Sequence, residues 1–236
     1  MTSKTMIRTA RLFSVLAATA LFGTFANAEE TPKPNAAGSG WSAQVATEGQ
    51  GAITLDANQS AMVDKVNGYF NALKTLQGRF VQTDANGEVM KGKFMMKRPG
   101  MFRFDYSRPS RQVIISDGTY LAIQDHDLNN EDRVALDQTP FRVLLREDVN
   151  LLRDSLISEV QENDTSLLLA LQDKSPDTPG RIRLVLAKTP DLALKEWITT
   201  DAQGLETRVE VRALKRDEEI DASRFVIKAP GSPFQQ

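Results

Sequence analysis

Residues 78–118 read GRFVQTDANGEVMKGKFMMKRPGMFRFDYSRPSRQVIISDG, and three or four strands follow one another in them through tight turns. Asn86-Gly87 predicts a hairpin with a type I′ turn, because both central positions of that turn need positive φ. Arg98-Pro99-Gly100 and Asp117-Gly118 predict the next two reversals. The stretch therefore indicates consecutive antiparallel strands.

Alternation between these turns predicts a sheet with one apolar face and one wet face. The apolar parity consists of Met90, Phe94, Met96, Phe102, Phe104 and Tyr106. The other parity carries Lys91, Lys93, Lys97, Arg103 and Asp105. Because large apolar side chains cannot stay in water, we expect other elements of the chain to cover the first face.

Composition narrows the class of protein. The chain has 236 residues, 41% hydrophobic and 25% charged, which suits a globular protein with a real core. Its formal charge of −2 and the lack of a basic cluster argue against nucleic-acid binding. Cysteine is absent, so we expect no disulfide, no thiolate metal site and no lipid-modified cysteine on this chain.

The N-terminus has the pattern of a secretory signal peptide. Lys4, Arg8 and Arg11 precede an apolar run at 12–25, and Ala26-Asn27-Ala28 follows as a small-x-small cleavage site. The run is shorter than the roughly 20 residues of a membrane span. We predict a signal peptide at 1–28, whose removal takes away three of the 29 cations and brings the formal charge from −2 to −5.

The rest of the chain predicts a leader, a helix and many strands. Prolines, glycines and small polar residues predict a disordered leader at 29–55, before a domain at 56–230. Apolar residues at helical spacing predict a helix at 58–75, capped by Asp56 or Ser60. Strands are predicted at 76–83, 88–97, 101–107, 111–116, 119–125, 131–136, 155–162, 165–172, 181–188, 192–201 and 204–213.

Short helices interrupt this series of strands. Thr139 as cap and Pro140 at the first helical position predict a helix that begins there. A second helical turn is expected around Val149 to Leu152, and a last short strand after 221–225. The fold class is thus mainly β with an α lid: an incomplete, unclosed antiparallel barrel of ten or eleven strands, covered by short helices and enclosing a hydrophobic cavity.

Catalysis has little support in the sequence. His126, between Asp125 and Asp127, is the single histidine and fits a polar strand end better than a metal or acid–base site. Motifs of serine hydrolases, zinc proteases and phosphate-binding loops are absent from the sequence. We therefore expect no enzyme, no catalytic residue, no metal and no cofactor.

Two features of residues 78–118 suggest a binding function. Methionines among the aromatics suit a surface that accepts varied apolar shapes, although a plain core would have the same pattern. Arg98 has the parity of Phe94 and Met96, so it points to the apolar side at the rim. It is either a solvated cation or a latch that donates to the free carbonyls at the end of a lid helix.

At these residues the chain resembles the LolA family of periplasmic carriers of outer-membrane lipoproteins. The resemblance runs from about Val63 to Pro230 and is carried by an ordered set of short motifs. They are Phe80-Val81-Gln82, Gly92-Lys93-Phe94, the run from Lys97 to Phe104, Ser116-Asp117-Gly118, Thr139-Pro140-Phe141 and the run from Asp221 to Phe225. The lid insert is shorter than the family's, and the 29–55 leader is unusual.

The resemblance implies a monomeric periplasmic carrier that takes lipoproteins from an inner-membrane ABC transporter to the outer-membrane acceptor LolB or an equivalent. It places the lid latch on Arg98, and an aromatic needed for transfer on Phe102. The residues expected to line the lipid cavity are Phe80, Met90, Phe94, Met96, Phe102, Phe104, Phe141 and Leu144. The alternatives are a LolA-like periplasmic lipid sensor or regulatory binding protein, and an unrelated periplasmic enzyme.

Overall fold

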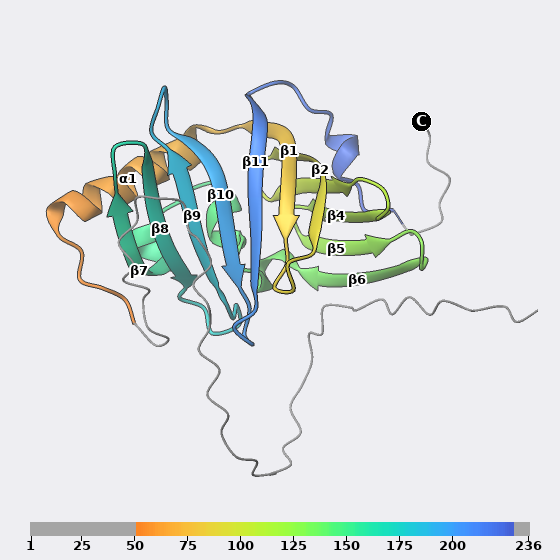
Figure 1. Ribbon diagram of the computed structural model, residues 1–236, viewed down its shortest axis with the longest axis horizontal. Helices are drawn as coiled ribbons and strands as arrows, with labels where there is room; N and C mark the ends of the chain where they lie inside the picture. The colour runs from red at the N-terminus through yellow and green to blue at the C-terminus, as the bar shows by residue number, and fades with distance from the viewer. Residues whose placement is uncertain (1–50, 229–236) are drawn as a thin grey trace, which may run out of the picture. The chain divides into compact units, whose positions relative to one another are not determined.

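The computed structural model describes residues 51–228, which belong to one compact unit of the chain (Figure 1). The predicted signal peptide at 1–28 and the leader as far as residue 50 lie outside the described residues. The last leader residues run beside a sheet edge, where the Ile53 N–H donates to the Ile157 carbonyl at 2.9 Å. Leu55 packs against the core.

Eleven antiparallel strands form a single sheet in the order β6-β5-β4-β3-β2-β1-β11-β10-β9-β8-β7. Within residues 51–228 the first and last strands, β1 and β11, pair in the middle, so β6 and β7 form the two edges of the sheet. This confirms the predicted unclosed antiparallel barrel. The strands are β1 (Thr75–Thr83), β2 (Val89–Lys97), β3 (Met101–Tyr106), β4 (Gln112–Asp117), β5 (Tyr120–Asp125), β6 (Asn130–Ala135), β7 (Ser155–Glu162), β8 (Ser166–Asp173), β9 (Arg181–Ala187), β10 (Ala193–Thr200) and β11 (Glu206–Arg216).

Helix α1 (Ala57–Ala72) covers the inner face of one half of the sheet and crosses behind β7 to β10 in Figure 1. Its first turn is fixed by a capping box, in which Asp56 accepts from the Gln59 N–H at 2.8 Å and Gln59 accepts from the Asp56 N–H at 3.1 Å. The helix ends three residues before the predicted 75, because Leu73 is already extended and β1 begins at Thr75.

The lid segment, residues 136–154, consists of three very short helices. They are η1 (Leu136–Gln138), α2 (Arg142–Leu145) and α3 (Leu151–Asp154). The prediction that Thr139 caps the lid helix was wrong. The Thr139 hydroxyl donates to the Leu136 carbonyl at 2.8 Å and closes η1 instead, and α2 begins at Arg142 without a side-chain cap.

Local side-chain bonds also overturn the type I′ turn predicted at Asn86-Gly87. The β1–β2 loop has five residues, and of its Asn86-Gly87 pair only Gly87 has positive φ, at +79°. Asp84 shapes the loop by accepting from the Asn86 and Glu88 N–H groups at 2.9 and 2.8 Å. Asp221 accepts from the Ser223 N–H at 2.8 Å in a 3₁₀ turn, η2 (Ala222–Phe225); residues 226–228 after it are not in a strand, and the rest of the predicted last strand lies outside the described residues.

The segment after β11 covers part of the outer face of the sheet, which the alternation predicted to be wet. Ile227 packs against a small apolar cluster of Val113, Ile115 and Ala122 on β4 and β5. Gln124 donates to the Lys228 carbonyl at 2.5 Å, and η2 contacts β3 and β4. Strands β4 and β5 are therefore covered on both faces.

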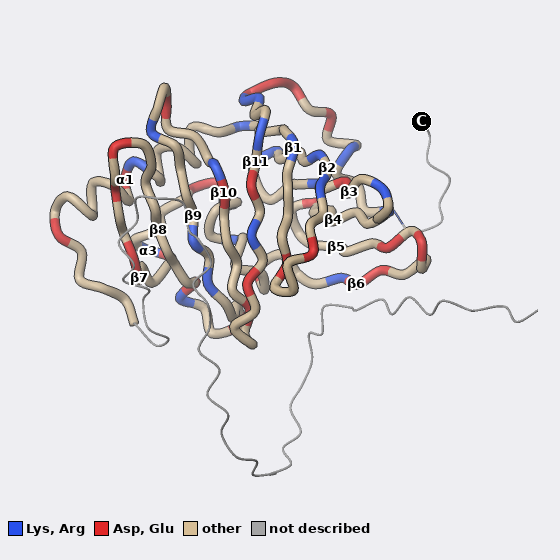
Figure 2. The backbone as a smooth tube through the Cα atoms, in the orientation of Figure 1, with Lys and Arg blue, Asp and Glu red and all other residues tan. Residues whose placement is uncertain are grey.

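The exposed remainder of the outer face carries both signs of charge. Figure 2 shows basic and acidic positions alternating along β11. Arg208 pairs with Glu196 on β10 at 2.6 Å, and Arg212 pairs with Glu210 at 3.1 Å. Glu196 is buried, whereas the Arg212–Glu210 pair is largely exposed, and exposed pairs stabilise a fold by no more than about 1 kcal/mol each.

The sheet leaves no room for a side chain at Gly92. Phe80 on β1 lies opposite Gly92 on β2, and its ring occupies the space above the glycine. A Cβ atom at Gly92 would lie 2.1 Å from the Asp105 carbonyl oxygen and 2.7 Å from Phe80 Cε1. Only glycine fits here, because both neighbours belong to the body of the sheet.

We expect Gly92→Ala to lower the free energy of unfolding by about 1–3 kcal/mol, since the added methyl group must displace a ring or a strand. Urea unfolding measured by tryptophan fluorescence tests this. Gly68→Ala is the matched control: it lies in α1 with nothing within 4 Å of the new Cβ atom, and it should leave stability unchanged or raised. Equal effects of the two substitutions would contradict the close packing at Gly92.

Candidate functional site

The eight residues predicted to line a lipid cavity all lie in one apolar cluster beneath the helices. Five of them are buried, and the other three are partly buried and pack against the cluster. The buried ones are Phe80, Phe94, Met96, Phe102 and Leu144. The partly buried ones are Met90, Phe104 and Phe141. The cluster thus joins the inner faces of β1 to β3 to the lid segment.

Phe104 is at the centre of the aromatic side chains. Its ring lies 5.5 Å from that of Phe94 in a stacked arrangement, and edge-on to those of Phe80 and Phe102 at 5.1 and 6.0 Å between centroids. Aromatic pairs in these geometries contribute roughly 0.5–1.5 kcal/mol each beyond their buried area. The inner face here is a set of mutually supporting rings.

Trp197 completes this aromatic group and was not predicted from the sequence. Its ring contacts that of Phe104 edge-on at 6.0 Å. An irregularity between Leu194 and Glu196 shifts the register of β10, so strict alternation from the buried Leu194 assigns Trp197 to the wrong face. The signal that could have found it is its size, since a tryptophan in a strand seldom stays in water.

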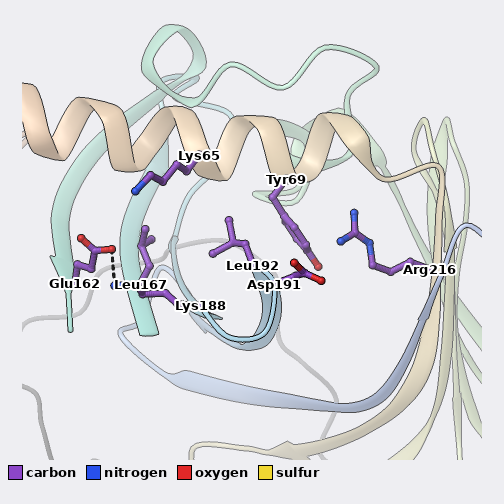
Figure 3. A pocket seen from close by; sticks show the side chains of 8 residues that line it. All are labelled: Lys65, Tyr69, Glu162, Leu167, Lys188, Asp191, Leu192 and Arg216. Atoms are coloured by element: carbon purple, nitrogen blue, oxygen red, sulfur yellow. Dashed lines mark ion pairs between the residues drawn. The ribbon is translucent and has the colours of Figure 1, made fainter. Parts of the chain in front are cut away.

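The lid segment touches this group directly, because the ring of Phe141 lies 6.4 Å from that of Phe102. None of the eight predicted residues lines the pocket of about 460 Å³ that Figure 3 shows, which Lys65 and Tyr69 of α1 border on one side. In this state the predicted lining residues pack against one another. An acyl chain can enter among them only if rings and lid move apart.

Arg98 connects α1 to the lid segment. Its guanidinium donates to the Phe70 carbonyl near the end of α1 and to the Arg146 carbonyl just after α2. It also donates to the Glu147 carbonyl at 3.1 Å. The first two carbonyls lie at helix ends, where partners within the helix become scarce; the Phe70 carbonyl also accepts from the Leu73 N–H at 3.2 Å. The side chain therefore has the contacts that the latch hypothesis requires, while its role in opening stays a prediction.

Further hydrogen bonds join the same elements around the Arg98 guanidinium. Asn71 donates to the Val149 carbonyl at 2.9 Å and accepts from the Val149 N–H at 2.8 Å. The Gly100 N–H donates to the Leu145 carbonyl at 2.9 Å. Burial lowers the pKa of the Arg98 guanidinium, against the opposite effect of the acidic residues 147 and 148. The end of α1, the β2–β3 turn and the lid segment thus converge on one cation.

A second arginine holds the start of the lid segment, and sequence reasoning missed it. Arg142 on α2 donates through Nη2 to Asp173 Oδ1 at 2.8 Å and through Nε to Asp173 Oδ2. Asp173, the last residue of β8, is 3% exposed. Burial raises the pKa of this carboxyl, but bonds from Arg142 and the Ser175 N–H outweigh it and leave the pKa lowered. The sequence pattern assigns Asp173 to the polar loop that follows β8, so nothing in it indicated a buried carboxylate.

His126 takes no part in this region. It lies in the turn after β5, where its backbone N–H donates to the Arg111 carbonyl at 3.3 Å. None of the helices between residues 51 and 228 has both the length and the apolar character that crossing a bilayer demands.

These features define the class of protein: a half-barrel whose apolar inner face lies under short helices, with an arginine that joins the helix ends. Residues 71–228 match the family described as outer membrane lipoprotein carrier protein LolA, so the chain belongs to this family. This confirms the resemblance noted in the sequence.

Relatives agree with this assignment. An outer-membrane lipoprotein carrier protein of Pseudomonas aeruginosa (strain UCBPP-PA14) is 29% identical over 198 residues, covering 79% of this chain and 92% of the relative. One of Alkalilimnicola ehrlichii is 32% identical over 194 residues, covering 74% and 83%. A solved LolA superfamily protein from Nitrosomonas europaea is 11% identical, with a TM-score of 0.42 over 72% of this chain and 97% of the solved chain.

We expect Asp173→Asn to lower the free energy of unfolding by about 1–3 kcal/mol at pH 7, because Arg142 loses its charged acceptor. The native contacts lower the pKa of Asp173, so its contribution is fully present above the unfolded pKa of about 3.9 and is lost as pH falls through the folded pKa. The stability difference between wild type and variant, measured by urea unfolding, should therefore shrink toward acid pH.

Asp164→Asn is the control for this experiment, since Asp164 is an exposed aspartate in the turn between β7 and β8. It should change stability by less than about 0.5 kcal/mol. A difference between wild type and Asp173→Asn that is the same at pH 7 and in acid would refute the charged pairing.

Proposed function

We propose that this protein carries outer-membrane lipoproteins through the periplasm, with their acyl chains held between the inner face of the sheet and the lid segment. The proposal rests above all on Arg98, which joins the end of α1 to the lid segment over an aromatic interior, in a chain of the LolA family. It includes an inner-membrane ABC transporter as donor and LolB or an equivalent as acceptor, with a monomeric carrier that performs no catalysis.

The physical need for a carrier comes from the acyl chains. Each CH₂ group removed from water contributes about 0.8 kcal/mol, so a lipoprotein cannot cross an aqueous compartment unshielded. The inner face supplies apolar area from β1 to β3, β10 and the lid segment. The predicted signal peptide and the names of the relatives support a periplasmic location.

The closed arrangement sets how the ligand is released. To admit an acyl chain, the lid must leave the Arg98 guanidinium, and charge-assisted bonds of this kind contribute roughly 1–3 kcal/mol each. That loss offsets part of the gain from burying the chain. A ligand is then bound tightly enough to be extracted from its donor. Reclosing of the lid favours the departure of the ligand, so the Arg98 contacts keep the ligand transferable.

Native mass spectrometry of the protein purified from a periplasmic extract tests the proposal. We expect a bound species whose mass is that of an intact lipoprotein, since the interior is apolar and the family's members are named for this cargo. A free lipid in place of a lipoprotein would favour a sensor. A protein that is always bare, even after incubation with lipoprotein in detergent, would contradict a carrier.

Arg98→Leu should still accept lipoprotein but should transfer it to acceptor vesicles at least about tenfold more slowly, because reclosing no longer regains the bonds to the helix ends. The measurement is transfer from preloaded carrier. Arg111→Leu is the control, since that exposed arginine has only a 3.8 Å ion pair with Asp127 and should not slow transfer. Unchanged transfer by Arg98→Leu would remove Arg98 from the mechanism.

A further inference from the structure

The outer face of the three central strands, β2, β1 and β11, is strongly basic. Glu210 is the one acidic residue in residues 91–97, 77–81 and 208–215 of these strands. Figure 2 shows basic positions on both β2 and β11. The cations are Arg79 on β1, Lys91, Lys93 and Lys97 on β2, and Arg208, Arg212 and Lys215 on β11. We call these seven residues the central basic face.

The register of the sheet decides which way these side chains point. Phe80 and Val211 lie opposite each other and are buried in the inner face. Successive side chains of a strand point to opposite faces, so the neighbouring row of Lys93, Arg79 and Arg212 points outward. All three of these cations are exposed.

Lys93, Arg79 and Arg212 form a row across three neighbouring strands. Arg79 lies directly opposite Lys93 on one side and Arg212 on the other. Neighbouring strands are about 4.8 Å apart, so the backbone positions of the three cations lie within about 10 Å. Like charges directly opposite each other destabilise a sheet. The fold by itself therefore gives no reason for this row.

The acidic side chains beside the row are already bound by other cations or by its end member. Glu210 pairs with Arg212 at 3.1 Å. Asp105, which lies opposite Lys93 on β3, pairs with Arg103 at 2.8 Å. The row therefore keeps an excess of positive charge.

Three cations of the central basic face have no ion pair among residues 51–228. They are Arg79, Lys91 and Lys93, and each of them is exposed. Adjacent cations raise the local electrostatic potential and attract anionic partners. The chain as a whole is acidic, with a formal charge of −2, so this face differs in sign from the rest of the protein.

We propose that the central basic face binds an acidic segment of another protein, with Lys93, Arg79 and Arg212 as the contacting row. Carboxylates on one side of a strand or helix are about 5–7 Å apart, which matches the spacing of the row. Complementary charge steers such a partner to this face and keeps it away from the acidic remainder of the surface.

A protein segment fits this face better than an anionic membrane does. The β1–β2 loop and the β10–β11 turn lie at the same end of the central strands, because Thr83 pairs with both Val89 and Arg208. Exposed acidic residues gather there, namely Glu88, Asp201 and Glu206. A bilayer laid against the face would meet these acids and be repelled, whereas a segment can follow the row and avoid them.

Binding at this face leaves the inner face free. The lid segment packs on the opposite side of the sheet, where Phe141 contacts Phe102. A partner could therefore hold the protein by its outer face without covering the lid. The inference goes beyond the proposed carriage of acyl chains and does not depend on it.

Fluorescence anisotropy of a labelled polyglutamate peptide, titrated with the purified protein, tests the proposal. We expect binding at low salt that is lost at 0.5 M salt, and no binding of a glycine–serine peptide of the same length. Vesicles of phosphatidylglycerol form the second arm. Binding of the vesicles without binding of the peptide would overturn the protein partner in favour of a membrane.

Arg79→Gln and Lys93→Gln should each weaken binding of the peptide about two- to fivefold, the effect of one exposed charge pair. Both should leave the urea unfolding midpoint unchanged or higher, because each removes repulsion within the row. The matched controls are Arg108→Gln and Lys65→Gln, at exposed cations without an ion pair among residues 51–228. Arg108 lies in the β3–β4 turn and Lys65 on α1, outside the central basic face.

Equal weakening by these controls would show an effect of net charge only and would overturn the central basic face as a binding site. A polyglutamate peptide that fails to bind at low salt would overturn it as well. Both results would leave the carriage of acyl chains standing, since that function is tested by the bound cargo and by transfer.

Discussion

An antiparallel sheet that does not close leaves a large apolar face, and the chain has little helix with which to cover it. Helix α1 has sixteen residues, but α2 and α3 have four each. A single helical turn has no stability of its own in water, because nucleation fixes several residues for one hydrogen bond. The cover over the aromatic rings must therefore be held by side chains of the sheet and by its own buried apolar residues.

Two arginines meet this need in different ways. Arg142 pairs with a buried carboxylate at the end of β8, and removing one partner of such a pair leaves the other poorly solvated. Arg98 instead donates to uncharged carbonyls at the ends of α1 and α2. Carbonyls can exchange the guanidinium for water at a smaller loss than a buried carboxylate. The lid segment is thus held by a charged pair with a buried carboxylate at Arg142, and near the β2–β3 turn by bonds between uncharged carbonyls and Arg98, Asn71 and Gly100.

The sequence was informative where one physical rule governs a position. Alternation located the strands and the inner-face aromatics, because successive side chains of a half-buried strand point to the apolar face and to the wet face in turn. It failed where a local bond or irregularity intervened: Asp84 reshaped the β1–β2 loop, and the shift after Leu194 concealed Trp197. The Arg142–Asp173 pair joins residues 31 apart in sequence, and a pairing over that distance leaves no local pattern to read.

The apolar cluster of Val113, Ile115, Ala122 and Ile227 has a mechanical consequence. With hydrocarbon packed on both surfaces, β4 and β5 cannot bend without losing contacts on one side or the other. That half of the sheet is braced from outside by the segment that follows β11. Next to β4 and β5, any expansion of the interior would therefore have to come from displacement of what covers their inner face, since these two strands are supported from outside.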